Sequence, residues 1–155
     1  MPMHPNAALI ERFYGCFQAR DGRGMMACYH PEASFSDPVF PDLKAADVGR
    51  MWRMLAGSAK DLTVTFGDIE ADDQTGRAKW RATYLFSATG RRVINRVEAR
   101  FTFQDGLIYT HQDRFCFWRW SSQALGPAGV LLGWNSALKH KVQAQAAGRL
   151  AQFKG

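Results

Sequence analysis

The residues best suited to chemistry lie in the segment Ala33 to Phe40, which places one carboxylate, Asp37, among apolar side chains and directly before Pro38. The proline biases Asp37 away from a helical and toward an extended backbone. Apolar neighbours desolvate a carboxylate and raise its pKa toward the range useful to a general base. The alternative interpretation is an ordinary turn aspartate before a proline, which needs no chemistry.

Three further polar residues interrupt strand-like stretches whose other inward positions are apolar: Asn95, His111 and Asp113. His111 and Asp113 are two residues apart and therefore project from the same side of one strand. A buried polar group without a hydrogen bond costs roughly 1–3 kcal/mol. We therefore expect the three to bond to one another, to water or to a ligand. They form either a structural network inside the sheet or the lining of a cavity that includes Asp37.

Aromatic residues are abundant, at 13% of the chain, and several are expected to surround these polar groups. Trp80 and Tyr84 share their strand face, and Tyr14, Phe35 and Trp52 are placed to close the other side. Core packing explains each ring taken singly, but together they suit an apolar, ring-containing ligand. The predicted catalytic residues are Asp37, His111 and Asp113. The predicted ligand-binding residues are Tyr14, Phe35, Trp52, Trp80, Tyr84 and Asn95.

Other reaction types have weaker signals. No serine lies in a Gly-x-Ser-x-Gly elbow, and no glycine-rich phosphate loop follows a strand. His30, His111, Asp113 and Asp37 lack the local spacing of metal ligands. We therefore expect no metal and no organic cofactor.

Composition fits one domain of 155 residues with a substantial core. The net charge of +6 favours solubility and anionic partners without specifying a function. Three widely spaced cysteines argue against a disulfide framework, and Met1 to Ala8 shows no signal-peptide pattern. A cytoplasmic protein with reduced thiols is expected.

The elements that must position the candidate residues follow from periodicity. Helical spacing predicts helices over about 6–18, 24–29 and 45–55, with a short strand at 33–36 between the second and third. Alternation then predicts long antiparallel strands over 62–66, 78–87, 93–103 and 107–117. The pattern predicts an α+β fold with three helices packed on a curved antiparallel sheet. After Trp120 the chain becomes helical again, with an apolar stripe between Ser136 and Phe153.

Two surface features remain open. The outward strand positions form a basic surface around Glu98, made of Lys79, Arg81, Arg92, Arg96, Arg100 and Arg114. Cross-strand pairing, dimerisation and anion contact all account for it; nucleic-acid binding is not expected, because exposed aromatics are few there. The apolar run from Val130 to Trp134 is too short to span a bilayer. It either packs in the core or, with Lys139 and Lys141 nearby, contacts a membrane surface.

Three helices, a Phe-x-Asp-Pro strand and a long curved meander together resemble the nuclear transport factor 2-like superfamily. That group includes ketosteroid isomerases, SnoaL-like polyketide cyclases, limonene epoxide hydrolases and scytalone dehydratases. The resemblance covers about Ala7 to Trp118 and implies a cone-shaped fold with a pocket between helices and sheet. The segment Phe35 to Val39 is similar to the ketosteroid isomerase segment that carries the base, which assigns that role to Asp37.

The chain departs from the isomerase pattern elsewhere. The isomerase's first-helix tyrosine falls at Phe13, next to Tyr14, and its protonated aspartic acid falls at Ala99. The oxyanion hole of that enzyme is therefore not reproduced, and steroid isomerase activity is not expected. The Asp-Arg-Asp set of the epoxide hydrolases is matched poorly, because Arg114 is expected to face outward.

These observations predict a SnoaL-like domain with a ligand pocket over residues 1–120 and a C-terminal helical extension of the same domain over 121–155. The extension caps the pocket mouth, packs on the sheet or contributes to a dimer. The predicted function is a cofactor-independent acid/base enzyme, of isomerase, cyclase, dehydratase or hydrolase type, acting on a small apolar substrate as a homodimer. The alternative is a non-catalytic binding protein for a hydrophobic or aromatic ligand.

Overall fold

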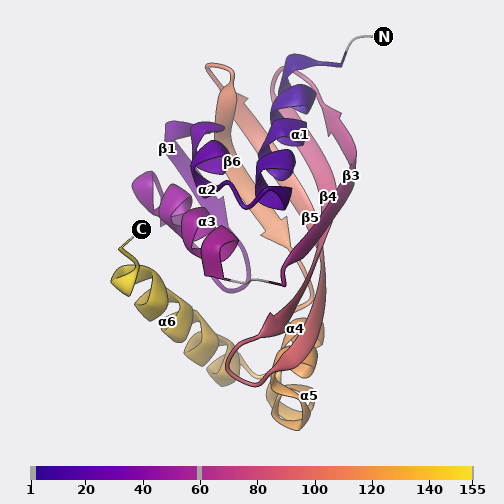
Figure 1. Ribbon diagram of the computed structural model, residues 1–155, viewed down its shortest axis with the longest axis vertical. Coiled ribbons are helices and arrows are strands. Elements are labelled where there is room, and N and C mark those ends of the chain that lie inside the picture. Colours follow the sequence, from indigo (N-terminus) through magenta and orange to yellow (C-terminus); the bar gives the residue numbers. More distant parts are fainter. Residues whose placement is uncertain (1–2, 59–60, 155) are drawn as a thin grey trace.

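The computed structural model describes residues 3–58 and 61–154, which form one mixed sheet with helices on one face and at one end (Figure 1). The helices are α1 (Pro5–Gln18), α2 (Gly22–Ala27), α3 (Ala46–Ser58), α4 (Phe117–Leu125), α5 (Pro127–Leu132) and α6 (Ser136–Gln152). The strands are β1 (Tyr29–Ser36), β2 (Leu43–Lys44), β3 (Thr63–Ala71), β4 (Thr75–Phe86), β5 (Arg91–Gln104) and β6 (Leu107–Arg114).

The sheet has the strand order β2-β1-β6-β5-β4-β3. Strands β3 to β6 form the predicted antiparallel meander, because short turns join them and a short turn forces antiparallel pairing. Strand β1 joins the far side of β6 in parallel, so that Phe35 lies level with His111. The predicted α+β fold, with α1 to α3 against one face of the sheet, is confirmed.

The core lies between those helices and the inner face of the sheet. Helix α1 contributes Ile10, Phe13, Tyr14 and Phe17, all buried and spaced to share one helix face. On β4 and β5 burial alternates with exposure as the sequence predicted, because side chains of a strand point alternately to its two faces.

The His4 side chain caps α1 by accepting a hydrogen bond from the backbone N–H of Asn6. Two local predictions were wrong. Tyr29 belongs to β1 rather than to the second helix. The alternation predicted for 107–117 fails at its start, because the register shifts between Thr102 and Phe103 and buries Ile108 instead of Tyr109.

The C-terminal helices return to the same body. Gly126 separates α4 from α5 with φ +68° and ψ −135°, a conformation that favours glycine. Helix α6 then runs back toward α3, where Arg50 donates hydrogen bonds to the carbonyl oxygens of Leu150 (2.9 Å) and Phe153 (2.7 Å). Gln143 donates to the carbonyl oxygen of Pro38 at 3.0 Å. The tail therefore packs against α3 and against the loop that carries Asp37.

Candidate functional site

A chain of hydrogen bonds runs through the core and ends on Asp113. The indole N–H of Trp52 donates to the Tyr29 hydroxyl oxygen (2.8 Å), and that hydroxyl lies 2.6 Å from Nδ1 of His111. Nε2 of His111 lies 2.8 Å from Oδ1 of Asp113, and the Trp80 indole reaches the same oxygen at 3.4 Å. The predicted contact between His111 and Asp113 therefore exists, and Tyr29 extends it.

One arrangement of protons satisfies the whole chain. Oδ1 of Asp113 can accept from two N–H groups at once, as a carboxylate oxygen does with its two lone pairs. His111 is then neutral, with its proton on Nε2, and its Nδ1 accepts the Tyr29 proton. A charged imidazole would carry a proton on both ring nitrogens, and the Tyr29 hydroxyl proton would then have no acceptor among these hydrogen-bonded groups. Leaving a buried donor unpaired in this way costs roughly 1–3 kcal/mol.

Aromatic rings seal His111 from solvent. Phe101 and Phe35 lie with ring centroids 4.4 and 4.9 Å from the imidazole, and its side chain has no exposed surface. Phe13 and Trp52 complete the enclosure. His111 is therefore placed to act through Asp113 rather than by touching a substrate itself.

Tyr14 carries an unused donor beside this chain. Its hydroxyl is fully buried and has no hydrogen-bond partner among the described residues. Burial, followed by the negative charge of Asp113, raises the pKa of Tyr14 well above its usual value. The hydroxyl therefore stays protonated at neutral pH and can donate a hydrogen bond to a ligand.

The two buried tyrosines are expected to respond oppositely to loss of the hydroxyl. Tyr14→Phe removes an unpaired polar group and should leave the free energy of unfolding unchanged or raise it by about 1 kcal/mol. Tyr29→Phe removes the partner of both Trp52 and His111 and should lower it by about 1–3 kcal/mol. Urea unfolding of the two variants measures both changes, and an equal loss in both would contradict the assignment of Tyr14 as unpaired.

Asp37 lies where β1 ends, in a turn that fixes its carboxylate. Oδ1 accepts the backbone N–H groups of Val39 (2.7 Å) and Phe40 (2.6 Å), and the backbone N–H of Asp37 donates to the Phe40 carbonyl. Burial raises the pKa of Asp37 to about 7, against the opposing effect of the two backbone donors, and the charge of Asp113 adds to the rise. Because Oδ1 takes both backbone bonds, Oδ2 is the oxygen left to take up a proton.

The parallel pairing of β1 and β6 brings the two carboxylates together. Phe35 lies level with His111 and Ser36 with Gln112. Continued by one residue past the end of β1, this register brings Asp37 toward Asp113, whose charge contributes to the raised pKa of Asp37. On the other side of Asp113, the small residue Ala99 stands directly opposite it on β5. The resemblance placed the isomerase's second acid at Ala99. In this protein Asp113 of β6, the residue opposite Ala99, supplies a carboxyl group at this level of the sheet.

The remaining predicted residues divide into two groups. Phe35 and Trp52 contact the His111 ring, and Trp80 contacts Asp113.

Tyr84 belongs to the second group. It accepts a hydrogen bond from the Trp120 indole at 2.8 Å. Burial is the main cause that raises the pKa of Tyr84, and the charge of Asp37 contributes. Asn95 is half-buried opposite Ala82, four residues along β5 from Ala99 and hence about 13 Å away along the strand. Asn95 therefore lies on Tyr84's side of the site rather than beside His111.

Sequence reasoning missed Tyr29 and Trp120. Tyr29 directly precedes His30 and Pro31, and its place on a strand depends on where α2 ends. Trp120 lies in a helix whose position against β4 and β5 the local pattern does not reveal. The alternation of β4 turns Tyr84 inward, and an inward-facing hydroxyl needs a hydrogen-bond partner. This was the one sequence signal that pointed toward a residue such as Trp120.

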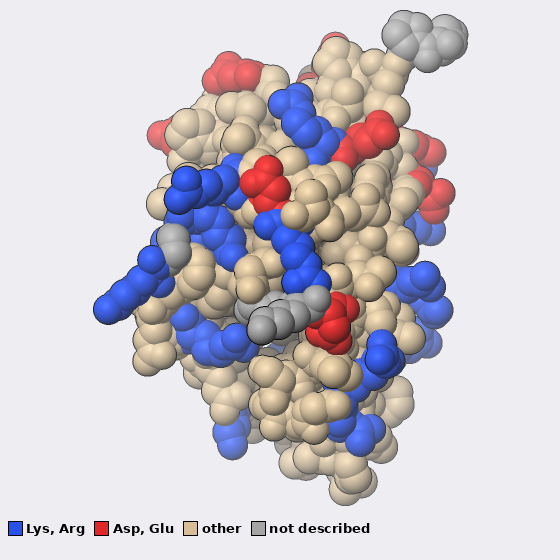
Figure 2. Space-filling model, in the orientation of Figure 1, with Lys and Arg blue, Asp and Glu red and all other residues tan. Residues whose placement is uncertain are grey.

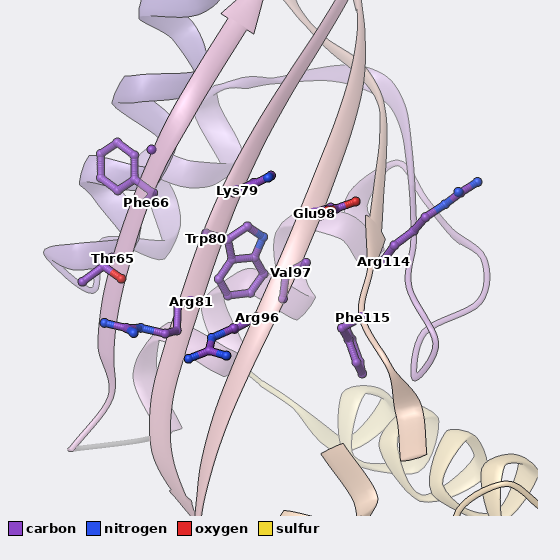
Figure 3. Close-up of a pocket in the computed structure, with 11 residues that line it drawn as sticks. Thr65, Phe66, Lys79, Trp80, Arg81, Arg96, Val97, Glu98, Arg114 and Phe115 are labelled. Atoms are coloured by element: carbon purple, nitrogen blue, oxygen red, sulfur yellow. The ribbon is translucent and has the colours of Figure 1, made fainter. Parts of the chain in front are cut away.

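The outer face of the sheet carries an open groove of about 690 Å³ (Figure 3). Strands β3 to β6 supply its side chains, including Lys79, Arg81, Arg96, Glu98 and Arg114. Lys79, Glu98 and Arg114 are level with one another on three adjacent strands, which matches the basic surface predicted around Glu98. Asp37, His111 and Asp113 do not line this groove, but Trp80 does, and its indole reaches Asp113. Trp80 therefore borders both the groove and the candidate site.

Within the described part of the chain, no three His, Cys, Asp or Glu side chains gather as metal ligands. The candidate site thus consists of two adjacent carboxylates, a sealed imidazole, an unpaired tyrosine hydroxyl and aromatic walls.

Comparison with known proteins gives a consistent result. A model of the SnoaL-like domain matches residues 10–111. An LEH-like epoxide hydrolase from M. tuberculosis is 18% identical, with a TM-score of 0.65 over 83% of this chain and 93% of that one. A protein assigned as a polyketide cyclase from Xanthomonas campestris pv. campestris is 16% identical, with a TM-score of 0.64 over 77% and 96%.

A third structure, TerC co-crystallised with polyporic acid, is 13% identical, with a TM-score of 0.61 over 91% of this chain and 99% of that one. At these identities the three structures show a shared fold. A comparison with functionally curated proteins found no match.

Proposed function

Because the chain belongs to the SnoaL-like domain family, we propose that it is a cofactor-independent acid/base enzyme acting on a small apolar substrate, with Asp37 as the base. Membership confirms the resemblance to the nuclear transport factor 2-like superfamily that the sequence suggested. The activities named for the similar structures, epoxide hydrolase and polyketide cyclase, support this class of chemistry.

The observation that carries the proposal is the environment of Asp37. A carboxyl group with a pKa of about 7 exchanges its proton readily at neutral pH, which suits a general base. The backbone bonds to Oδ1 fix the group, and Oδ2 takes a proton from a carbon acid or from water. The nearby charge of Asp113 makes Asp37 a stronger base. The Tyr14 hydroxyl is a donor for the oxygen on which negative charge develops in the substrate.

His111 and Asp113 have a supporting role in this proposal. The imidazole holds the Asp113 carboxylate in place, and the charge of Asp113 acts on Asp37 and Tyr14. Trp80 and Tyr84 are partly exposed and supply aromatic surface, and Phe35 and Trp52 support it from the core. Asn95 supplies a half-buried hydrogen-bonding group. This surface favours a substrate that contains a ring.

A non-catalytic binding protein is the second candidate, and one observation favours it. The rings around His111 leave its side chain no exposed surface, as expected of a structural network. In that case the two carboxylates and Tyr14 would orient a hydrophobic or aromatic ligand without changing it.

The test is turnover of a panel of aromatic enones, phenolic polyketide-like compounds and epoxides, followed by mass spectrometry. Wild-type protein should convert at least one compound, with kcat/KM rising with pH to a plateau above about 7. Asp37→Asn should reduce the rate by about 10²–10⁴-fold. The matched control Asp42→Asn changes an exposed aspartate in the same loop and should keep full activity.

Two outcomes would decide against the proposal. Full activity in Asp37→Asn removes Asp37 from the mechanism. A compound that binds wild-type protein, Asp37→Asn and Asp42→Asn and is recovered unchanged from all three supports the binding protein instead. The homodimer and the cytoplasmic location remain predictions from the sequence.

A further inference from the structure

Helix α5 and the residues after it lie at one end of the molecule (Figure 1). Large apolar side chains are exposed in this segment. Val130, Leu131, Leu132 and Trp134 are 49%, 68%, 49% and 75% exposed, and we call these four residues the apolar tip. The sequence left open whether this run packs in the core, and the structure excludes that. Contiguous exposed apolar residues of this size typically mark a site of interaction.

The apolar tip is exposed because α5 packs through its small residues. Gly129 is buried so closely against α4 that a Cβ there would stand 1.9 Å from the Ser121 carbonyl oxygen. Gly133 is also buried, with a Cβ position 2.2 Å from the Ser121 hydroxyl oxygen. The Trp118 indole N–H of α4 also donates a hydrogen bond to the Val130 carbonyl oxygen of α5 at 3.1 Å. Glycines thus face inward and leucines face outward, the reverse of an ordinary surface helix.

The surrounding charge is of one sign. From Arg114 to the end of the sequence there are six Lys and Arg residues and no Asp or Glu, which leaves 14 of each kind in residues 1–113. Residues 114–155 therefore carry the whole net charge of +6, and three of their basic residues, Arg119, Lys139 and Lys141, lie on α4 and in the first half of α6. Figure 2 agrees on the face it shows, where the lower end of the molecule has basic and uncharged residues but no acidic ones.

We propose that the apolar tip docks on the surface of an anionic lipid bilayer. Leucine and tryptophan side chains enter the boundary between headgroups and acyl chains, where tryptophan is favoured. Basic residues on the flanking helices, among them Arg119 and Lys141, face the negatively charged headgroups. Of the described residues, none forms a helix with the length and apolar character needed to cross a bilayer, so the contact is superficial.

Charge selects this partner over a second copy of the chain. Two tips in contact would bring together two sets of the basic residues on α4 and at the start of α6, Arg119, Lys139 and Lys141, which is unfavourable. An anionic bilayer provides an apolar acyl region for the exposed leucine and tryptophan side chains and negatively charged headgroups for the basic residues. This inference is independent of the reaction proposed for Asp37.

Co-sedimentation with lipid vesicles tests the proposal on the full chain. Wild-type protein should bind phosphatidylcholine vesicles that contain phosphatidylglycerol about tenfold better than pure phosphatidylcholine vesicles, and high salt should weaken this binding. The double variant Leu131→Ser, Trp134→Ser should lose binding, since it removes the most exposed apolar surface. Arg119→Glu with Lys141→Glu should remove the preference for the anionic lipid.

Two control variants make matched changes elsewhere. Met26→Ser replaces an exposed apolar residue of α2, and Lys44→Glu reverses an exposed charge on β2; both should bind like wild type. Circular dichroism checks that every variant is folded, and the charge variants test the proposal even if the apolar double variant unfolds. Absence of wild-type binding to the anionic vesicles would overturn the proposal. So would light scattering that shows a dimer in wild type and a monomer in the apolar double variant, because the tip would then bind a second copy.

Discussion

Replacing Asp113 with alanine is expected to lower the free energy of unfolding by about 3–5 kcal/mol. The variant leaves the N–H groups of His111 and Trp80 without their acceptor in a region closed to water. It also removes the acceptor that orients the His111 ring, which in turn bonds to Tyr29 and through it to Trp52. Chemical denaturation at neutral pH measures the loss.

The control for this effect is Asp73→Ala, which removes an aspartate that pairs with His4 at the surface. The Asp73 side chain is 95% exposed, so the free energy of unfolding should hardly change. A similarly small effect at Asp113 would show that the buried chain does not stabilise the fold. Asp113→Asn adds a second readout. Removing the charge while keeping the shape should lower the pKa of Asp37, which NMR of the carboxyl carbon can follow.

Raising the pH from about 4 to about 8 is expected to destabilise the wild-type protein relative to Asp37→Asn. The pKa of Asp37 is about 7 in the folded protein, above the ordinary value of 3.8. Below the ordinary value both states hold the proton and the stabilising contribution is complete. Between the two values the unfolded chain releases the proton first, so stability falls and the contribution is lost above about pH 7.

The size of this difference is at most about 4 kcal/mol, reduced by the partial solvent contact of a half-buried residue. Asp37→Asn should therefore be the more stable protein at about pH 8 and should lose that advantage at about pH 4. Urea titrations of both proteins across this range supply the measurement, with Asp42→Asn following wild type. Parallel curves for wild type and Asp37→Asn would mean that the Asp37 carboxyl is not held in a desolvated state.

The sequence predicted best what depends on neighbouring residues. Alternation predicted that the side chains of β4 and β5 point alternately inward and outward, because the period of a strand is a local property. Helical spacing identified the buried face of α1 for the same reason. The shift between Thr102 and Phe103 was beyond this reasoning, since one extra residue in a strand leaves no mark on composition.

The candidate site depends on contacts between distant parts of the chain, which explains what could not be predicted. His111 and Asp113 were paired correctly because they are two residues apart on one strand. The position of Asp37 beside Asp113 follows from the parallel register of β1 on β6, and no short turn links these strands to fix that register. Tyr29 was missed because α2 ends earlier than its pattern suggested, so its hydroxyl was not expected in the core.

The way α6 is fastened has a practical consequence for handling the protein. Gln143 holds the backbone of the Asp37 loop, and Arg50 holds the last turn of the same helix. A bulky domain fused directly behind α6 would therefore stand next to the contacts that hold the last turn of this helix. Figure 1 places the start of α1 far from α6, which makes that side of the molecule the better place for a fusion or for immobilisation.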